Sequence, residues 1–421
     1  AFYSFDDRYL LTATIRRDGS SKFAKGHRWG WFPSVALAWR ASQESFLREL
    51  PWLYNAKLRA GWGKTGNQNV ADWATVALLS YKTTPWGTGV LTGNTPNTEL
   101  TWETTTSWNL GLDFGVLDNR IELVADIYYK KTNNLLLQVQ IPGFVGSSGH
   151  GAASNPWDNV GSIENKGVEL TLNTTNISNR DFQWTSNVVF GLNRNKVASL
   201  DTENATLDKS FQPSSKSLIV TRTVVGQPIG QFYGLKVIGR FDKPTDFYYH
   251  DAQGNLCEVA RPKGEAIDKA QTWLGYYIYE DVNGDGVIDA GDYQFIGNPE
   301  PKFTWGFGNT FSWKGLDLTV FFQGSYGGKA LNLTRMRIEN PRDNNNILRS
   351  SLNYARVGKL DPNGPDDDFR NLYVINSGST DMIGLTLNAS NYAYNEVSDR
   401  FIEDASYIRL QNISLGYTLP R

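Results

Sequence analysis

Long runs in which apolar and polar residues alternate limit most strongly how this chain can fold. From Trp102 to Phe114 the even positions are aromatic, aliphatic or threonine, whereas the odd positions are small, polar or charged. Side chains along a β-strand point to opposite faces in turn, so the pattern predicts strands with one apolar and one polar face. Comparable runs predict about ten strands, at 3–17, 28–40, 54–65, 101–115, 120–132, 164–176, 182–195, 302–313, 316–327 and 405–419.

Two kinds of connection join these strands, and they alternate along the chain. The short ones lie at 115–119, 177–181 and 314–315, with one of medium length at 41–53. The long ones lie at about 18–27, 66–100, 133–163, 196–301 and 328–404. In an antiparallel sheet this alternation places every long connection at the same rim, as in outer-membrane barrels with tight inner turns and long outer loops. The predicted fold class is therefore all-β, an antiparallel transmembrane β-barrel.

The polar face carries more charge than the dry core of a soluble sandwich tolerates, whereas a water-filled or plugged lumen accepts it. We therefore assign the polar face to a lumen and the apolar face to lipid. Many tryptophans lie near strand ends, which is typical of interfacial girdles, although core packing in a soluble β protein is the alternative. The charged residues are Arg16, Lys57, Arg59, Glu103, Asp113, Glu122 and Asp126, and the girdle tryptophans are Trp29, Trp31, Trp39, Trp52, Trp62, Trp102, Trp108, Trp184, Trp305 and Trp313.

Charge and composition argue against other classes of function. The chain has 41 basic and 43 acidic residues, so its net charge does not favour binding to a nucleic acid. Cys257 is the only cysteine, and no apolar run is long enough for a membrane-spanning helix. No phosphate-binding glycine loop, zinc-protease motif or serine-hydrolase elbow occurs. We expect no enzyme activity, no catalytic residue and no nucleic-acid partner.

One segment has the spacing of a calcium-binding loop. Residues 281–292 read D-V-N-G-D-G-V-I-D-A-G-D, with a glycine at the position that needs a sharp turn. All the donors would be hard oxygens, which favours Ca²⁺, although an aspartate replaces the usual final glutamate. An acidic turn without an ion is the alternative. The predicted ligands are Asp281, Asn283, Asp285, Val287 through its carbonyl, Asp289 and Asp292.

Several segments resemble the SusC/RagA-type TonB-dependent outer-membrane transporters of Bacteroidota. They are RRDGSSKFA (16–24), GWFPSVALAWR (30–40), LRAGWGKTGNQ (58–68), NVGSIENKGVELTLN (159–173), the stretch from DVNGDG to GSYG (281–327) and ASYIRLQNISLGYTLP (405–420). These matches run through essentially the whole chain. The resemblance implies a 22-stranded barrel with a plug, of which residues 1–421 form a portion. It places the protein in the cell outer membrane.

The same resemblance implies a function and partners. Such a barrel imports an oligosaccharide or a peptide, together with a SusD-like surface lipoprotein and with energy supplied through TonB. Neither the plug nor a TonB box is found in this sequence, so we expect the chain to be part of a longer polypeptide. Aromatic rings on long connections could stack on a sugar or contact a partner. The candidates for substrate contact are Trp73, Trp86, Trp157, Trp273, Tyr276 and Tyr277.

Two other interpretations remain open from sequence. A secreted, soluble β protein that binds carbohydrate through calcium-braced loops would share the aromatic residues and the acidic motif. A passive channel or an adhesin barrel without TonB would share the strands and the alternating connections.

Overall fold

The structure is a computed structural model of the chain. It describes residues 1–139, 153–201, 205–212, 217–262, 273–339, 346–366, 368–384 and 396–419.

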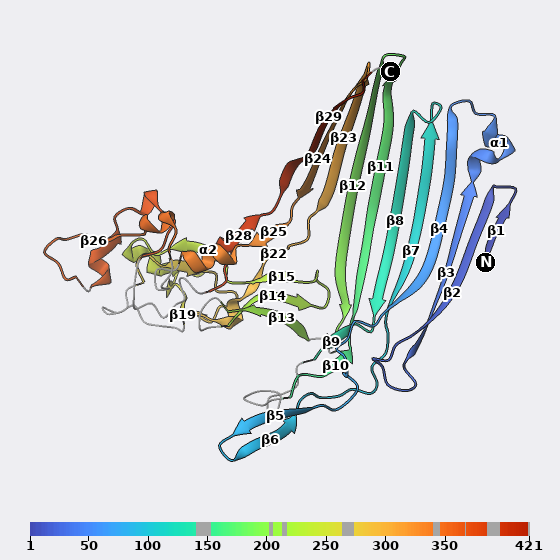
Figure 1. Cartoon of the computed structure of the whole chain (residues 1–421). Coiled ribbons are helices and arrows are strands. Elements are labelled where there is room, and N and C mark those ends of the chain that lie inside the picture. Colours follow the sequence, from blue (N-terminus) through green and yellow to red (C-terminus); the bar gives the residue numbers. More distant parts are fainter. Residues whose placement is uncertain are drawn as a thin grey trace.

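An eleven-stranded antiparallel sheet, here called the wall, dominates the structure (Figure 1). Its strands lie side by side in chain order, which confirms the predicted topology, with eleven strands in place of about ten. They are β1 (Phe2–Phe5), β2 (Tyr9–Gly19), β3 (Trp29–Arg40), β4 (Leu53–Asn67), β7 (Glu103–Val116), β8 (Ile121–Asn133), β11 (Ser162–Ser178), β12 (Phe182–Ser199), β23 (Phe303–Trp313), β24 (Leu316–Tyr326) and β29 (Tyr407–Tyr417).

The prediction of a single strand at 3–17 was wrong. This segment forms β1 and β2, which pair through Phe5 and Tyr9 across a tight turn. Asp6 and Asp7 in the turn have φ angles of 52° and 50°, a left-handed conformation that aspartate tolerates better than most residues. The turn contains no glycine or proline, which are the strongest turn signals in a sequence.

The two rims of the wall differ as predicted (Figure 1). The short-turn rim, at the top of the figure, carries the connections at 6–8, 41–52, 117–120, 179–181 and 314–315. Its longest connection contains the short helices η1 (Ala41–Gln43) and α1 (Ser45–Arg48). The long-connection rim carries 20–28, 68–102, 134–161, 200–302 and 327–406, and includes the hairpins β5 (Leu79–Thr84)–β6 (Gly87–Thr92) and β9 (Leu136–Gln138)–β10 (Trp157–Asn159).

The apolar face of the wall is open. Strand register places Val35, Trp62, Trp108 and Tyr129 in one row on this face. Trp108 and Leu110, two positions apart on β7, are each 56% exposed. No second sheet covers them in the described part of the chain. This agrees with an apolar face that meets lipid and disagrees with a sealed sandwich core.

Trp102 was wrongly assigned to the girdle. Its side chain is only 8% exposed, and its ring packs on Phe23 and Phe32 at the long-connection rim. The indole Nε1 donates a hydrogen bond of 3.2 Å to the carbonyl oxygen of Arg28. Trp102 precedes β7, so the alternation of that strand does not set its direction.

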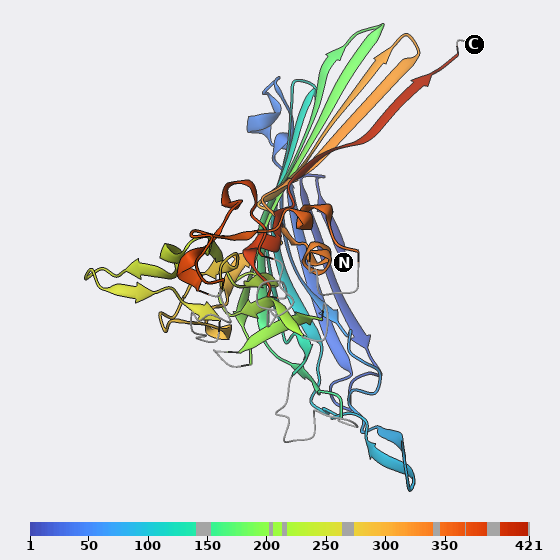
Figure 2. The same cartoon turned by 90° about the vertical axis from the view of Figure 1, so that its left-hand side faces the viewer.

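The two longest connections fold together into a body that we call the lobe, made of the described residues within 200–302 and 327–406 (Figure 2). Backbone hydrogen bonds join the two, such as Leu235 N to Val397 O at 2.9 Å. Buried clusters form its core, one around Leu235, Ile288 and Ile383. The lobe contains β13 (Thr206–Phe211), β14 (Leu218–Val224), β15 (Gln231–Gly234), β16 (Val237–Arg240), η3 (Pro244–Phe247), β17 (Tyr248–His250), β18 (Leu256–Glu258), β19 (Arg261–Pro262), β20 (Tyr277–Tyr279), β21 (Val287–Ile288), η4 (Ala290–Asp292), β22 (Gln294–Gly297), β25 (Lys329–Leu331), α2 (Leu333–Ile338), η5 (Arg349–Leu352), β26 (Val357–Lys359), η6 (Phe369–Asn371), β27 (Leu372–Val374), η7 (Ser377–Ser379), η8 (Asp399–Phe401) and β28 (Ile402–Asp404).

The helices in the described part of the chain are all short. Among the described residues, none is long and apolar enough to cross a membrane.

Candidate functional site

A connected group of ion pairs lies on the polar face of the wall. Arg59 on β4 donates through Nε to Asp113 on β7 at 2.9 Å. Its two terminal nitrogens donate to both carboxylate oxygens of Asp126 on β8, each at 3.0 Å. Lys57 Nζ lies 3.7 Å from the other oxygen of Asp113. Two cations and two carboxylates thus balance one another, and this balance lets charged side chains line a half-buried surface.

Gly111 makes this arrangement possible. It is the strand partner of both Arg59 and Asp126, so it lies between them on β7. A Cβ atom at this position would lie 2.5 Å from Asp126 Oδ1 and 2.6 Å from Arg59 Cζ. The absence of a side chain is therefore what allows the guanidinium group to cross β7.

A second polar cluster fastens the lobe to the long-connection rim. Glu300, just before β23, accepts hydrogen bonds from the amide groups of Asn193 at 2.6 Å and Asn195 at 2.8 Å. The Tyr128 hydroxyl on β8 donates to Asn193 Oδ1 at 2.9 Å. Asn195 Oδ1 also accepts from the backbone N–H of Ile229 at 2.7 Å. These bonds tie the base of the lobe to β8 and β12.

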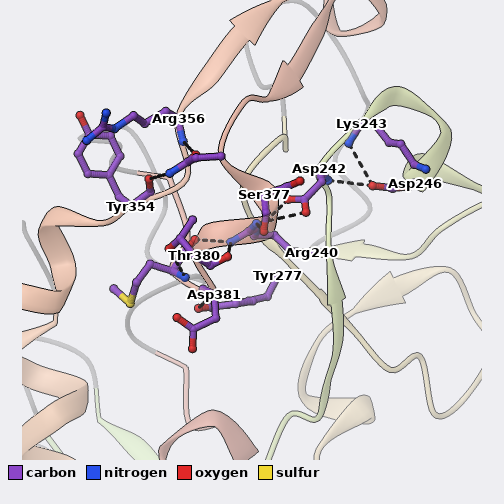
Figure 3. A network of polar contacts seen from close by, with 12 residues as sticks. Arg240, Asp242, Lys243, Asp246, Tyr277, Tyr354, Arg356, Ser377, Thr380 and Asp381 are labelled. Carbon is purple, nitrogen blue, oxygen red and sulfur yellow. Dashed lines mark hydrogen bonds and ion pairs between the residues drawn. The ribbon is translucent and has the colours of Figure 1, made fainter.

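Arg240 holds two distant segments of the lobe together (Figure 3). Its guanidinium group pairs with Asp242 at 2.6 Å and donates to the carbonyl oxygens of Ser377, Thr380 and Met382 at 2.7–3.2 Å. The Tyr277 hydroxyl donates to the carbonyl oxygen of Asp381 at 2.8 Å in the same segment. The side chain of Arg240 is buried, and its donors go to the carboxylate of Asp242 and to backbone carbonyl oxygens.

A buried carboxylate forms a second junction in the lobe. Glu339 is 2% exposed and accepts from Arg335 Nε at 2.7 Å and Arg400 Nη1 at 2.5 Å. The guanidinium group of Arg400 lies 5.2 Å from the ring centre of Tyr277, which belongs to the other long connection. Burial raises the pKa of Tyr277 and of nearby Tyr279 above the usual tyrosine range. The lobe is therefore a packed body, whereas its sequence predicted only loops.

The six aromatic candidates do not converge on one site. Trp273 and Tyr277 are buried and Tyr276 packs beside them, which favours a structural role for all three. Trp157 is half-buried against the cluster around Trp102. Trp86, at the tip of the β5–β6 hairpin, is 93% exposed, and Trp73 is also exposed. Substrate contact by any of these residues stays a prediction, with Trp73 and Trp86 the most accessible.

The acidic loop 281–292 is closed by its own hydrogen bonds. Asp281 accepts from the N–H groups of Gly284 and Gly286 at 2.7 and 2.9 Å. Asp292 is fully buried and accepts from Val282 and Asp289 at 2.9 and 2.8 Å. Oxygen donors of this kind suit Ca²⁺. Within the described ranges, however, no three acidic, histidine or cysteine side chains are grouped to hold a metal ion. Calcium binding at Asp281, Asn283, Asp285, Val287, Asp289 and Asp292 stays a prediction.

Comparison with known proteins identifies the family. Residues 2–421 match the family described as TonB dependent receptor-like, beta-barrel. The chain belongs to this family. Its members are outer-membrane proteins, so the protein lies in the cell outer membrane and the interpretation as a secreted soluble protein was wrong.

Named relatives and a solved structure agree with this assignment. The chain is 33% identical to TonB-dependent receptor P26 of Formosa agariphila and 31% identical to TonB-dependent receptor SusC of Bacteroides thetaiotaomicron. Each match covers 99% of this chain, and the chain spans 38% and 37% of the length of these two relatives. A structure of the RagAB peptide importer is similar in fold, with 24% identity and a TM-score of 0.73 over 100% of this chain and 40% of that one.

Sequence reasoning found some of these features and missed others. It placed Lys57, Arg59, Asp113 and Asp126 on the polar face, but it did not bring them together. Strand register could have done so, because Arg59, Gly111 and Asp126 form one row across three strands. No local signal pointed to Arg240 or Glu339 as junctions, because each has one near partner, Asp242 or Arg335, while its other partners lie on distant segments.

Proposed function

We propose that the chain forms part of the wall and outer surface of an importer that takes up a nutrient across the outer membrane, with energy supplied through TonB. The observation that carries this proposal is the charged, internally balanced polar face of the wall below long connections at a single rim. Such a face suits a hydrated or plugged passage. Membership of the TonB-dependent receptor family supports the same function.

The proposed partners follow from the relatives. A SusD-like surface lipoprotein would contact the long-connection side, where the lobe offers a packed surface, and TonB would act from the opposite side. The substrate would be an oligosaccharide or a peptide. The RagAB relative is a peptide importer by name, which supports a peptide. The exposed rings of Trp73 and Trp86 support a sugar, because flat aromatic rings can stack on its faces.

The test is uptake by cells that make the native polypeptide. Labelled oligosaccharides and peptides are supplied to cells with and without the encoding gene, and to cells without TonB. We expect one substrate class to be taken up only when both the gene and TonB are present. Uptake that needs the gene but continues without TonB would support a passive channel instead. Equal growth and uptake without the gene, for every substrate, would contradict the proposal.

We also propose that loop 281–292 binds Ca²⁺ and thereby braces the lobe. The donor chemistry supports this idea, and the ion would have to replace some of the internal hydrogen bonds of Asp281 and Asp285. Calcium titration of the native polypeptide by calorimetry, compared with Asp281→Asn/Asp285→Asn, tests it. In the wild type, but not in the variant, we expect heat of Ca²⁺ binding and slower proteolysis of the lobe with Ca²⁺ than without it. No heat and unchanged proteolysis in the wild type would refute calcium binding.

A further inference from the structure

Two rows of side chains on the apolar face, next to the long-connection rim, are unusually basic. The pairing of β4, β7, β8, β11 and β12 fixes both rows, because directly paired residues of antiparallel strands lie on the same face. The first row is Trp62, Trp108, Tyr129, Lys166 and Arg194, and the second is Lys64, Thr106, Lys131, Glu164 and Lys196. These two described rows therefore contain five cations and a single carboxylate.

The five cations of these described rows are only partly neutralised by the one carboxylate within them. Lys166 and Arg194 are direct strand partners, and both are exposed. Like charges placed directly opposite each other destabilise a sheet. Arg194 Nη1 donates to the carbonyl oxygens of Asn193 and Lys302, at 2.6 and 3.0 Å, and these neutral acceptors add no negative charge. Glu164 lies 3.3 Å from Lys131 and opposite Lys196, so one carboxylate faces two cations.

The other end of the same face is different. Near the short-turn rim, the matching rows of β7, β8, β11, β12 and β23 contain no charged side chain. These rows are Val116, Ile121, Thr174, Ser186 and Asn309, followed by Phe114, Leu123, Leu172, Val188 and Phe307. The basic rows are therefore a feature of one membrane surface, the one from which the long connections extend.

Depth in the membrane indicates what these cations meet. Below them on the same face lie Leu110 and Ile127, which suit hydrocarbon, and the first row itself begins with aromatic rings that suit the interface. The cations thus lie at the level of lipid headgroups on the outer side. Phosphate groups are the anions that headgroups offer at this depth, and lysine and arginine bind them well.

We propose that the rows around Lys166 and Arg194 bind the phosphate groups of a phosphorylated lipid in the outer leaflet. The anion would bridge the two opposed cations and remove their mutual repulsion, while Tyr129 and Trp108 pack on the lipid below it. This contact follows from the outer-membrane location of the family and does not depend on transport or on the substrate.

The experiment measures lipid binding by the native polypeptide in a neutral detergent. The probe is lipid A, a phosphorylated glycolipid, and the readouts are native mass spectrometry and the lipid-dependent rise in Tm. Two further probes are dephosphorylated lipid A and inorganic phosphate. The variant is Lys166→Gln/Arg194→Gln. The matched control is Lys130→Gln/Lys25→Gln, which removes two exposed charges, one of them from the opposite face of β8.

We expect the wild type and the control to bind lipid A at least tenfold more tightly than Lys166→Gln/Arg194→Gln does. Both should bind dephosphorylated lipid A at least tenfold more weakly than they bind lipid A. Without lipid, Lys166→Gln alone should be at least as stable as the wild type, because the like-charge pair is gone while the hydrogen bonds from Arg194 to carbonyl oxygens remain. Lys196→Gln alone should weaken lipid binding by a smaller factor, and it serves if the double variant does not fold. The proposal would be overturned if Lys166→Gln/Arg194→Gln, or Lys196→Gln, bound lipid A as tightly as the wild type. Binding of inorganic phosphate as tight as that of lipid A would overturn the choice of a lipid.

Discussion

Arg59 and Asp126 form a two-pronged ion pair although a whole strand, β7, separates the strands that carry them. The pair exists because Gly111, the residue between them, has no side chain. Asp113 completes the arrangement from β7 itself. Three strands of the wall are therefore joined on their polar face by one guanidinium group.

Gly111→Ala should weaken the wall. The added Cβ would displace Asp126 or Arg59, and such overpacking typically lowers the free energy of unfolding by about 1–3 kcal/mol. Thermal unfolding in detergent measures the effect. The control is Gly61→Ala, on the neighbouring strand, where a new Cβ meets nothing within 4 Å. Equal stability of both variants would show that the ion pair does not need the space at Gly111.

Arg240→Ala should loosen the lobe but not the wall. The change removes a buried ion pair and three carbonyl contacts, which we expect to cost about 3 kcal/mol. Limited proteolysis should then cut the lobe faster while the wall stays resistant. Arg370→Ala is the control, because Arg370 is exposed and, among the described residues, its ion pair is with nearby Asp368. If protease cuts both variants at the wild-type rate, Arg240 does not hold the two segments of the lobe together.

Acid should weaken the junction between β25 and β28. Hydrogen bonds from Ser406, and then Lys329, lower the pKa of Asp404 to about 2. The stability that Asp404 contributes is therefore present above its ordinary pKa of about 4 and is lost as the pH falls toward 2. The Tm difference between wild type and Asp404→Asn should be present at pH 7 and shrink between pH 4 and pH 2. A difference that does not change with pH would contradict this assignment.

Alkali should act on the lobe through its buried tyrosines. Burial raises the pKa of Tyr277 and Tyr279, so their contribution to stability is present below about pH 10 and is lost as the pH rises through the folded-state values. Absorbance at 295 nm should show phenols that ionise late in the folded protein. Tyr277→Phe/Tyr279→Phe should remove two of them, and denaturant should abolish the delay in the wild type. If the two phenols that the double variant lacks ionise at an ordinary pKa in the folded wild type, the lobe core is open to water.

Local patterns predicted the wall well and the lobe poorly. Alternation and connection length depend on nearest neighbours along one strand, so they gave the strand order and the two rims. They failed at Asp6 and Asp7, where a tight turn has no glycine, and at Trp102, which lies outside the strand whose pattern it continues. The lobe depends on contacts such as those between Arg240 and Met382, which lie far apart in the sequence. No periodicity reports contacts of that kind.

The claim on which the account rests is that the apolar face of the wall meets lipid and the polar face meets water. Asn109 and Leu110 are neighbours on β7, both exposed but on opposite faces, so they test it directly. Each is replaced by cysteine (N109C or L110C) in a cysteine-free background of the native polypeptide. The membranes are first permeabilised so that reagent can reach the lumen. They are then treated with either a water-soluble, membrane-impermeant maleimide or a lipid-soluble maleimide. We expect N109C to react with the water-soluble reagent, whereas L110C should react only with the lipid-soluble one. The reverse pattern, or equal reaction of both with the water-soluble reagent, would contradict the claim.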